Sequence, residues 1–133
     1  MVDNLSKDKR SKVMRSIRPK DTKPELLVRR ILTTMGYRYR LHRKDIPGRP
    51  DIAFIGRKKA IFVNGCFWHA HENCPISHTP DSKFWREKLI ANKERDKKAL
   101  VNLKSIGWKS LTLWECELKN ESRIRRVLKK YLG

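Results

Sequence analysis

The spacing of apolar and polar residues predicts one layered α/β domain. Residues 21–36, DTKPELLVRRILTTMG, place their apolar side chains on one helical face, and Thr22 and Glu25 have the spacing of a capping box. YRYRLH then alternates like a strand, and the runs DIAFI and AIFVN are typical of core strands joined by a tight GRKK connection. A long helix over 82–106, a strand WKSLTLWEC and an amphipathic helix ESRIRRVLKKYL follow. This order predicts a mixed central sheet flanked by helices.

The predicted helix over 82–106 has an unusual seam. Residues at spacings of four and three share one side of it, and the middle of that side is polar. We therefore do not expect the whole helix to face a core. The seam comprises Trp85, Leu89, Asn92, Asp96, Ala99, Leu103 and Ile106.

The net charge of the chain indicates the kind of partner that it binds. The chain has 133 residues, with 33 Lys and Arg against 14 Asp and Glu and a formal net charge of +19. Such an excess favours a polyanion, and nucleic acid is the leading candidate, because a duplex presents a dense line of phosphates. A membrane surface is the rival, but the sequence has no long apolar run, signal peptide or lipidation motif. We expect an intracellular, cytoplasmic, DNA-associated monomer.

The first twenty residues differ from the rest. They are basic and carry few apolar anchors, so we expect residues 1–20 to form an arm that binds nucleic acid and residues 21–133 to form a single domain. A solvated tail is an equally good reading of the composition alone.

Cysteines and a histidine suggest a metal site. Cys66, His71 and Cys74 form a C-x4-H-x2-C pattern, and Cys116 ends the predicted strand WKSLTLWEC. A Cys3His set is a recognised structural zinc composition, and four protein ligands leave no open position for catalysis. A polar loop of this kind cannot bury enough apolar surface to fix itself, so zinc would stabilise it. The alternative is a set of buried free cysteines.

Two carboxylates and a second histidine suggest phosphodiester cleavage. Asp51 follows the turn PGRP and begins an apolar strand, where it is either an ordinary turn residue or a cation ligand. Glu25 has a purely structural interpretation as a helix-capping residue. His69 would over-fill the zinc site if it joined His71 there. Beside a DNA-binding surface, these groups fit a magnesium-assisted reaction in which the ion binds oxygen ligands and activates water.

Several stretches resemble the very short patch repair (Vsr) endonuclease family. They are RSKVMRSI, DTKPE, PGRPDI, FVNGCFWHAH, FWREKLIANKERD and GWKSLTLWEC. The resemblance covers most of residues 10–116 and implies a restriction-endonuclease-like fold with a structural zinc loop. It also implies a magnesium-dependent, strand-specific nick beside the thymine of a T:G mismatch, the product of 5-methylcytosine deamination. Repair proteins are a further class of partner.

The resemblance also implies roles for individual residues. Asp51 matches a magnesium-binding aspartate, the backbone carbonyl of Val63 a metal contact, His69 a catalytic histidine and Glu25 a supporting carboxylate. The zinc ligands match Cys66, His71, Cys74 and Cys116. Among the DNA-binding residues, the aromatics that wedge into the base stack match Phe67, Trp68 and Trp85. A residue inserted from the opposite groove matches Met14, and two base contacts match Lys88 and Asn92.

Asn64 departs from the family pattern, because the best-studied members have a histidine there. An amide can orient water but cannot transfer a proton near neutral pH, so His69 must carry more of the catalysis. Asn92 could equally lie in the solvated middle of a partly buried helix.

Three functions compete: a mismatch-directed nicking endonuclease, a restriction-type or junction-cleaving nuclease without mismatch preference, and a non-catalytic zinc-stabilised DNA-binding module. The wedge aromatics argue against the second, and Asp51 with His69 against the third.

Overall fold

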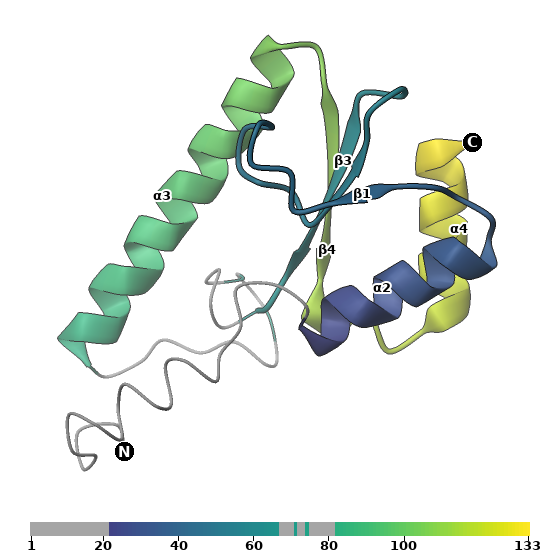
Figure 1. Ribbon diagram of the computed structural model, residues 1–133. Coiled ribbons are helices and arrows are strands. Elements are labelled where there is room, and N and C mark those ends of the chain that lie inside the picture. Colours follow the sequence, from purple (N-terminus) through teal and green to yellow (C-terminus); the bar gives the residue numbers. More distant parts are fainter. Residues whose placement is uncertain (1–21, 67–70, 72–73, 75–81) are drawn as a thin grey trace.

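The computed structural model describes residues 22–66, 71, 74 and 82–133 (Figure 1). Its elements are α2 (Lys23–Thr34), β1 (Arg40–Leu41), β2 (Ile52–Phe54), β3 (Lys59–Asn64), α3 (Lys83–Ser105), β4 (Lys109–Trp114), a 3-10 turn η2 (Glu115–Glu117) and α4 (Glu121–Leu132). The observed order agrees with the prediction from sequence, and the mixed sheet flanked by helices is confirmed. The predicted arm, residues 1–20, lies outside the described residues and stays a prediction.

The four strands lie in the order β1-β2-β3-β4. The first two pairings are antiparallel and the third, β3 with β4, is parallel. A parallel pair needs a long crossover, and α3 lies in the chain segment that makes it. The carboxyl ends of β3 and β4 therefore meet at one edge, with Asn64 opposite Trp114.

Helices cover both faces of the sheet (Figure 1). The larger core packs α2 and α4 on one face, and alternate strand residues such as Ile52, Phe54, Ile61 and Val63 point into it. A smaller core on the other face joins Ala53 and Ala60 to Leu103 of α3. Alternation along β2 and β3 thus assigns each side chain to one of two cores.

The first predicted strand is shorter than expected. We predicted a strand over YRYRLH, but only Arg40 and Leu41 pair with β2. The amide of Tyr37 donates to the carbonyl of Leu32 instead, and Gly36 has φ +89°, so these residues close the end of α2. The rings of Tyr37 and Tyr39 pack edge-on against Phe54. Their alternation reflects packing on the core rather than pairing in a sheet.

Helix α3 is only partly buried, as the polar seam predicted. Its buried residues are Trp85 and Leu89 near one end and Leu103 near the other. Asn92 and Asp96 in the middle are half-buried, whereas Ile106 at the end of the predicted seam is exposed. Across the described residues, no helix combines the length and the apolar character needed to cross a membrane.

Candidate active site and metal centre

Within the described ranges, two clusters of ligand-type side chains involve residues next to the ends of strands. One consists of Cys66, His71, Cys74 and Cys116, and the other of Glu25, His42 and Asp51. Within each cluster the ligand atoms lie within 4.8 Å of one another. The first lies just beyond the carboxyl ends of β3 and β4, and the second joins the start of α2 to the β1–β2 connection.

Parallel pairing brings the distant cysteines together. Cys66 follows β3 by two residues and Cys116 follows β4 by two, so the register that pairs Asn64 with Trp114 carries both to the same place. The amide of Cys116 lies 3.3 Å from Sγ of Cys66 and donates to it. We had expected Cys116 within the last strand, but β4 ends at Trp114 and Cys116 lies in the 3-10 turn.

The geometry of this cluster fits a zinc ion. Sγ of Cys116 and Nδ1 of His71 are 3.5 Å apart, and bond lengths of about 2.3 Å for sulfur and 2.0–2.1 Å for nitrogen give a tetrahedral edge of about 3.6 Å. The His71 ring stacks on Trp114, with centroids 4.0 Å apart and planes at 7°, which fixes its orientation. These four residues could hold one metal ion in a closed site.

Ionisation of the thiols also favours a cation. The pKa of Cys66 is raised to about 12, chiefly by burial and then by the neighbouring Cys74 and Cys116 side chains, against a hydrogen bond from the Cys116 amide. Burial likewise raises the pKa of Cys116. Thiolates crowded in this way persist near neutral pH when a metal binds them, because the ion supplies the compensating charge.

The second cluster is built around Asp51. Oδ2 of Asp51 accepts a hydrogen bond of 2.7 Å from the amide of Val63, just past the ladder between β2 and β3. Glu25, which is only 1% exposed, contributes the second carboxylate from the first turn of α2. Its amide donates weakly to the hydroxyl of Thr22 at 3.4 Å, so the predicted helix cap is present as well. The Thr22 half of the predicted capping box is therefore observed, and the side chain of Glu25 lies in the cluster with His42 and Asp51.

The electrostatics of Asp51 are those of a cation site. The pKa of Asp51 is raised to about 7, chiefly by burial and then by the charge and hydrogen bonding of Glu25, against the opposing effects of the Val63 amide and His42. Two carboxylates in contact away from bulk water repel one another unless a proton or a metal ion lies between them. A divalent cation that prefers oxygen ligands would fit between such a pair of carboxylates.

Backbone geometry places two further predicted residues at this edge. In an extended strand the amide and carbonyl of one residue point the same way, so the carbonyl of Val63 faces the side on which its amide meets Asp51. Asn64 ends β3 and is 8% exposed. The fold thus brings Glu25, Asp51 and Val63 together. The roles assigned to these residues and to Asn64 stay predictions.

Sequence reasoning missed His42. Its amide donates to the carbonyl of Asp51 at 3.3 Å, and its Nε2 lies 2.9 Å from Oε2 of Glu25. A hairpin register would have found it, because Leu41 pairs with Ile52 and the next residues outward are His42 and Asp51. His42 is the last residue of the predicted strand YRYRLH, and the alternation of that stretch indicates packing but gives no signal for a ligand.

The predicted DNA-contacting residues of α3 differ in exposure. Trp85 is 8% exposed, while Lys88 and Asn92 are half-buried on the same side of the helix. Phe84 is 55% exposed, packs edge-on against Trp85 and has the Lys88 amine 6.0 Å from its ring centroid. Arg95 donates a hydrogen bond to the side chain of Asn92. The predicted contacts Met14, Phe67 and Trp68 and the predicted catalytic His69 lie outside the described residues.

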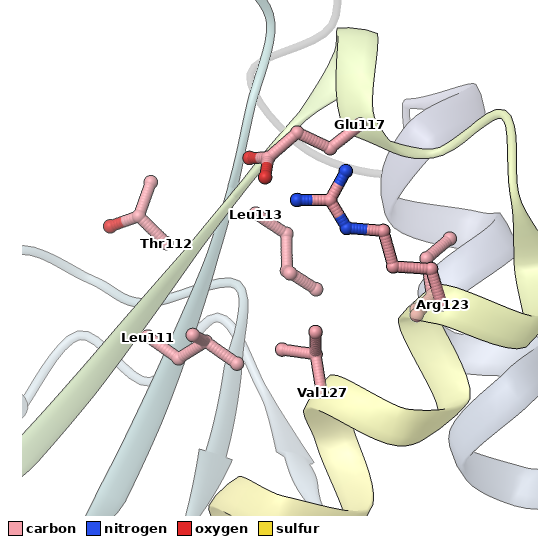
Figure 2. A pocket seen from close by; sticks show the side chains of 7 residues that line it. Leu111, Thr112, Leu113, Glu117, Arg123 and Val127 are labelled. Carbon is pink, nitrogen blue, oxygen red and sulfur yellow. The ribbon is translucent and has the colours of Figure 1, made fainter.

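A small pocket lies between β4 and α4 (Figure 2). Among the residues that the structure describes, no predicted site residue lines this pocket, and we assign it no function. Its lining comprises Leu111, Thr112, Leu113, Glu117, Arg123, Ile124 and Val127.

Comparison with known proteins identifies the family. Residues 2–75 match the family described as DNA mismatch endonuclease Vsr. The chain is 44% identical over 134 residues to the Type II nicking enzyme V.XorIIP of Xanthomonas oryzae, covering 96% of this chain and 98% of the relative. It is 45% identical over 132 residues to V.NmeAIP, a Type II nicking enzyme of Neisseria meningitidis, covering 98% of this chain and 94% of the relative. Identity to the DNA mismatch endonuclease Vsr of Escherichia coli is 37% over 126 residues, covering 93% of this chain and 80% of that enzyme.

An α/β sheet with clusters of ligand-type side chains at its edge, together with these relatives, defines one class of protein, a DNA endonuclease. The chain belongs to the Vsr family. The family predicted from the sequence and the predicted enzyme class are both confirmed.

Proposed function

We propose that this endonuclease nicks one strand of duplex DNA beside the thymine of a T:G mismatch, with magnesium as cofactor, and so starts repair of deaminated 5-methylcytosine. The observation that carries the proposal is the position of Asp51. Its carboxylate is held by the Val63 amide at the end of a core strand, next to the buried carboxylate of Glu25. The E. coli relative is named as a DNA mismatch endonuclease, which supports the substrate.

The residues of the catalytic edge have distinct roles in this proposal. Asp51 and the carbonyl of Val63 would hold a magnesium ion, which when bound neutralises phosphate charge and lowers the pKa of water. Glu25 keeps the field of the site negative and orients its polar partners. His69 accepts the proton of the attacking water as its oxygen bonds to phosphorus and the bond to the leaving sugar oxygen breaks. Asn64 orients water without taking a proton.

Affinity and selectivity come from different parts of the chain. The net charge of +19 supplies attraction to any duplex through phosphate contacts. Phe67, Trp68 and Trp85 act as the wedge, Met14 enters from the opposite groove, and Lys88 and Asn92 contact bases. A mispaired step is easier to unstack than a matched one, so inserted aromatics favour it.

Zinc has a structural role in the same proposal. Bound by Cys66, His71, Cys74 and Cys116, it would fix the segment that carries Phe67 and Trp68 to the ends of β3 and β4. The basic arm, residues 1–20, would add phosphate contacts. Monomeric action, a cytoplasmic location and engagement of repair proteins remain predictions.

A cleavage assay tests the proposal. Matched and T:G duplexes, each labelled on one strand at a time, are incubated with the full chain in magnesium and in magnesium-free buffer. We expect one nick, in the thymine strand of the T:G duplex, with magnesium present. Equal cleavage of both duplexes would favour a restriction-type nuclease, and cleavage independent of added divalent metal would refute the magnesium assignment.

A further inference from the structure

His42 is a member of the catalytic cluster that the proposed chemistry does not use. Its ring nitrogen Nε2 lies 2.9 Å from Oε2 of Glu25, and the ligand atoms of His42, Glu25 and Asp51 all lie within 4.8 Å of one another. An imidazole is a metal ligand as well as a proton carrier. The question is whether this ring serves Glu25 or a cation.

The orientation of the ring favours a cation. Nε2 is fully buried, yet within the part of the chain that the structure describes it has no hydrogen-bond partner, because Glu25 lies close but off the direction of an N–H bond. The neighbouring Arg29 already donates to the same oxygen, Oε2 of Glu25, at 3.3 Å. A buried ring nitrogen that lies among carboxylate oxygens without a hydrogen bond is in the position of a metal ligand.

The spacing is also that of a coordination shell. Metal–ligand distances of about 2.1 Å place neighbouring ligands of an octahedral ion about 3.0 Å apart. The separation of 2.9 Å between Nε2 of His42 and Oε2 of Glu25 matches such an edge. The remaining separations, up to 4.8 Å, suit ligands farther apart around the same ion or joined to it through water.

The backbone is set up to hold the ring there. His42 has φ +47°, a left-handed conformation that costs free energy for a residue with a side chain. Its amide bond to the carbonyl of Asp51 fixes it opposite the other ligand. Each element of the cluster therefore contributes one donor: Glu25 from α2, His42 from the end of β1 and Asp51 from the start of β2.

We propose that His42 and Glu25 join Asp51 as side-chain ligands of the catalytic cation, in addition to the Val63 carbonyl, and that His42 makes the site prefer a first-row transition metal ion such as Mn2+ over Mg2+. Carboxylates and carbonyls suit both ions, whereas an imidazole ligand favours transition metals and adds little affinity for magnesium. This inference rests on the proposed function only in placing the cation at Asp51, and it adds Glu25 and His42 as ligands.

Metal binding, measured apart from cleavage, tests it. The zinc-loaded full chain is titrated with Mn2+ while the free ion is followed by electron paramagnetic resonance, and Mg2+ affinity is obtained by competition. Pulsed spectra of bound Mn2+ report coupling to a ligand 14N nucleus. Both measurements are made without DNA and with a matched duplex.

The variants are chosen so that the new residue can adopt the positive φ of residue 42. His42→Gly removes the ligand, and His42→Asn replaces it with a shorter oxygen ligand. Both residues tolerate positive φ. Lys58→Gly is the matched control, because Lys58 has φ +54° and is exposed in the β2–β3 hairpin.

We expect His42→Gly to weaken Mn2+ binding at least about tenfold, the lower end of what even outer ligand changes cost, and to alter Mg2+ affinity much less. The 14N coupling should vanish in His42→Gly and His42→Asn and persist in Lys58→Gly. An equal loss for both ions would make His42 a positioning residue for Glu25 and overturn the proposal. Unchanged Mn2+ binding, persistent coupling, or no coupling in the wild type under either condition would overturn it too. Nicking in magnesium is scored separately, so these outcomes are distinct from failure of the proposed function.

Discussion

The amide of Val63 donates a hydrogen bond of 2.7 Å to Oδ2 of Asp51. The strand that orients the candidate catalytic carboxylate is therefore the strand that leads, three residues later, into the cysteine cluster at Cys66. A displacement of the end of β3 would therefore shift both the hydrogen bond to Asp51 and the position of Cys66. One short backbone segment links the two candidate metal sites.

Replacing the central carboxylate should separate cleavage from binding. Asp51→Ala should abolish nicking, because it removes a metal-bound carboxylate and its stabilisation of transition-state charge, while DNA binding stays largely intact. Asp45→Ala is the matched control, since Asp45 is exposed and paired with Arg43. Nicking rates and duplex affinity decide the matter. Full activity of Asp51→Ala in magnesium would remove Asp51 from the site.

Replacing His69 and Asn64 should rank the groups that handle water. His69→Ala should be severe, because it removes the proton acceptor, and Asn64→Ala should be milder, because an amide only orients water. Single-turnover nicking rates of both variants test this order. An Asn64→Ala loss as large as the loss for His69→Ala would reverse it.

The raised pKa of Asp51 predicts a pH dependence of stability. The folded pKa is about 7 against an ordinary value of 3.8, so between these values the folded state binds more protons than the unfolded state. Stability without added magnesium should therefore fall as pH rises through this window. Asp51→Asn removes the titration and should become more stable than the wild type towards pH 8, by on the order of 1–4 kcal/mol. Unfolding of the zinc-loaded protein at pH 5 and pH 8, with Asp45→Asn beside it, measures the difference. A variant that loses stability with pH as the wild type does would contradict this.

Removing one zinc ligand should loosen the metal centre. Elemental analysis should find one zinc per chain, and Cys116→Ser should lower both zinc content and thermal stability, since the ion loses the thiolate that ties the end of β4 to the end of β3. DNA binding should weaken in parallel. Ser110→Ala, on the exposed part of β4, serves as control. Zinc-free protein with unchanged folding and activity would refute the structural site.

Gly48 should tolerate no side chain. A Cβ there would lie 2.6 Å from the Cβ of Ala99 on α3 and 3.2 Å from the ring of Phe62, at φ +81°. Gly107 has the same φ but no atom within 4 Å, so Gly107→Ala reports strain alone, about 1–2 kcal/mol. Gly48→Ala should cost roughly 1–3 kcal/mol more, the usual cost of overpacking. Denaturant unfolding measures both, and equal losses would mean that the contact with α3 yields freely.

The wedge should act on mismatched DNA alone. Trp68→Ala should remove roughly 1–3 kcal/mol of binding to the T:G duplex, typical of base–aromatic stacking, and hardly change the matched duplex. Arg10→Ala should weaken both duplexes alike, because phosphate contacts carry no sequence information. Paired titrations at fixed salt compare them. An equal loss for Trp68→Ala on both duplexes would make it a packing residue.

The fold was largely predictable from the sequence because the periodicity of each element agrees with its burial. Leu27 and Val28 of α2, like Ile124 and Leu128 of α4, fall on the faces that the pattern assigned to the core. The prediction failed at Tyr37 and Tyr39, where aromatic packing on Phe54 produces the alternation of a strand without its hydrogen bonds.

The candidate site was less predictable, because its members are joined by contacts that local patterns do not encode. Asp51 was evenly balanced between turn residue and ligand until the fold placed Glu25 beside it. The cysteine pattern predicted its cluster, whereas the arrival of Cys116 depends on the parallel register of β3 and β4. His42 carries no motif, and its place follows only from the hairpin register.

The parallel return of β4 to β3 makes everything between Cys66 and Cys116 a loop closed at its base, with α3 inside it. The entropy of closing a loop grows only with the logarithm of its length, so added or deleted residues change the stability of the base little. Changes of length between Cys74 and Ser82 leave Glu25, Asp51 and the ends of both strands where they are. Evolution can therefore lengthen or shorten that segment without rebuilding the candidate catalytic edge.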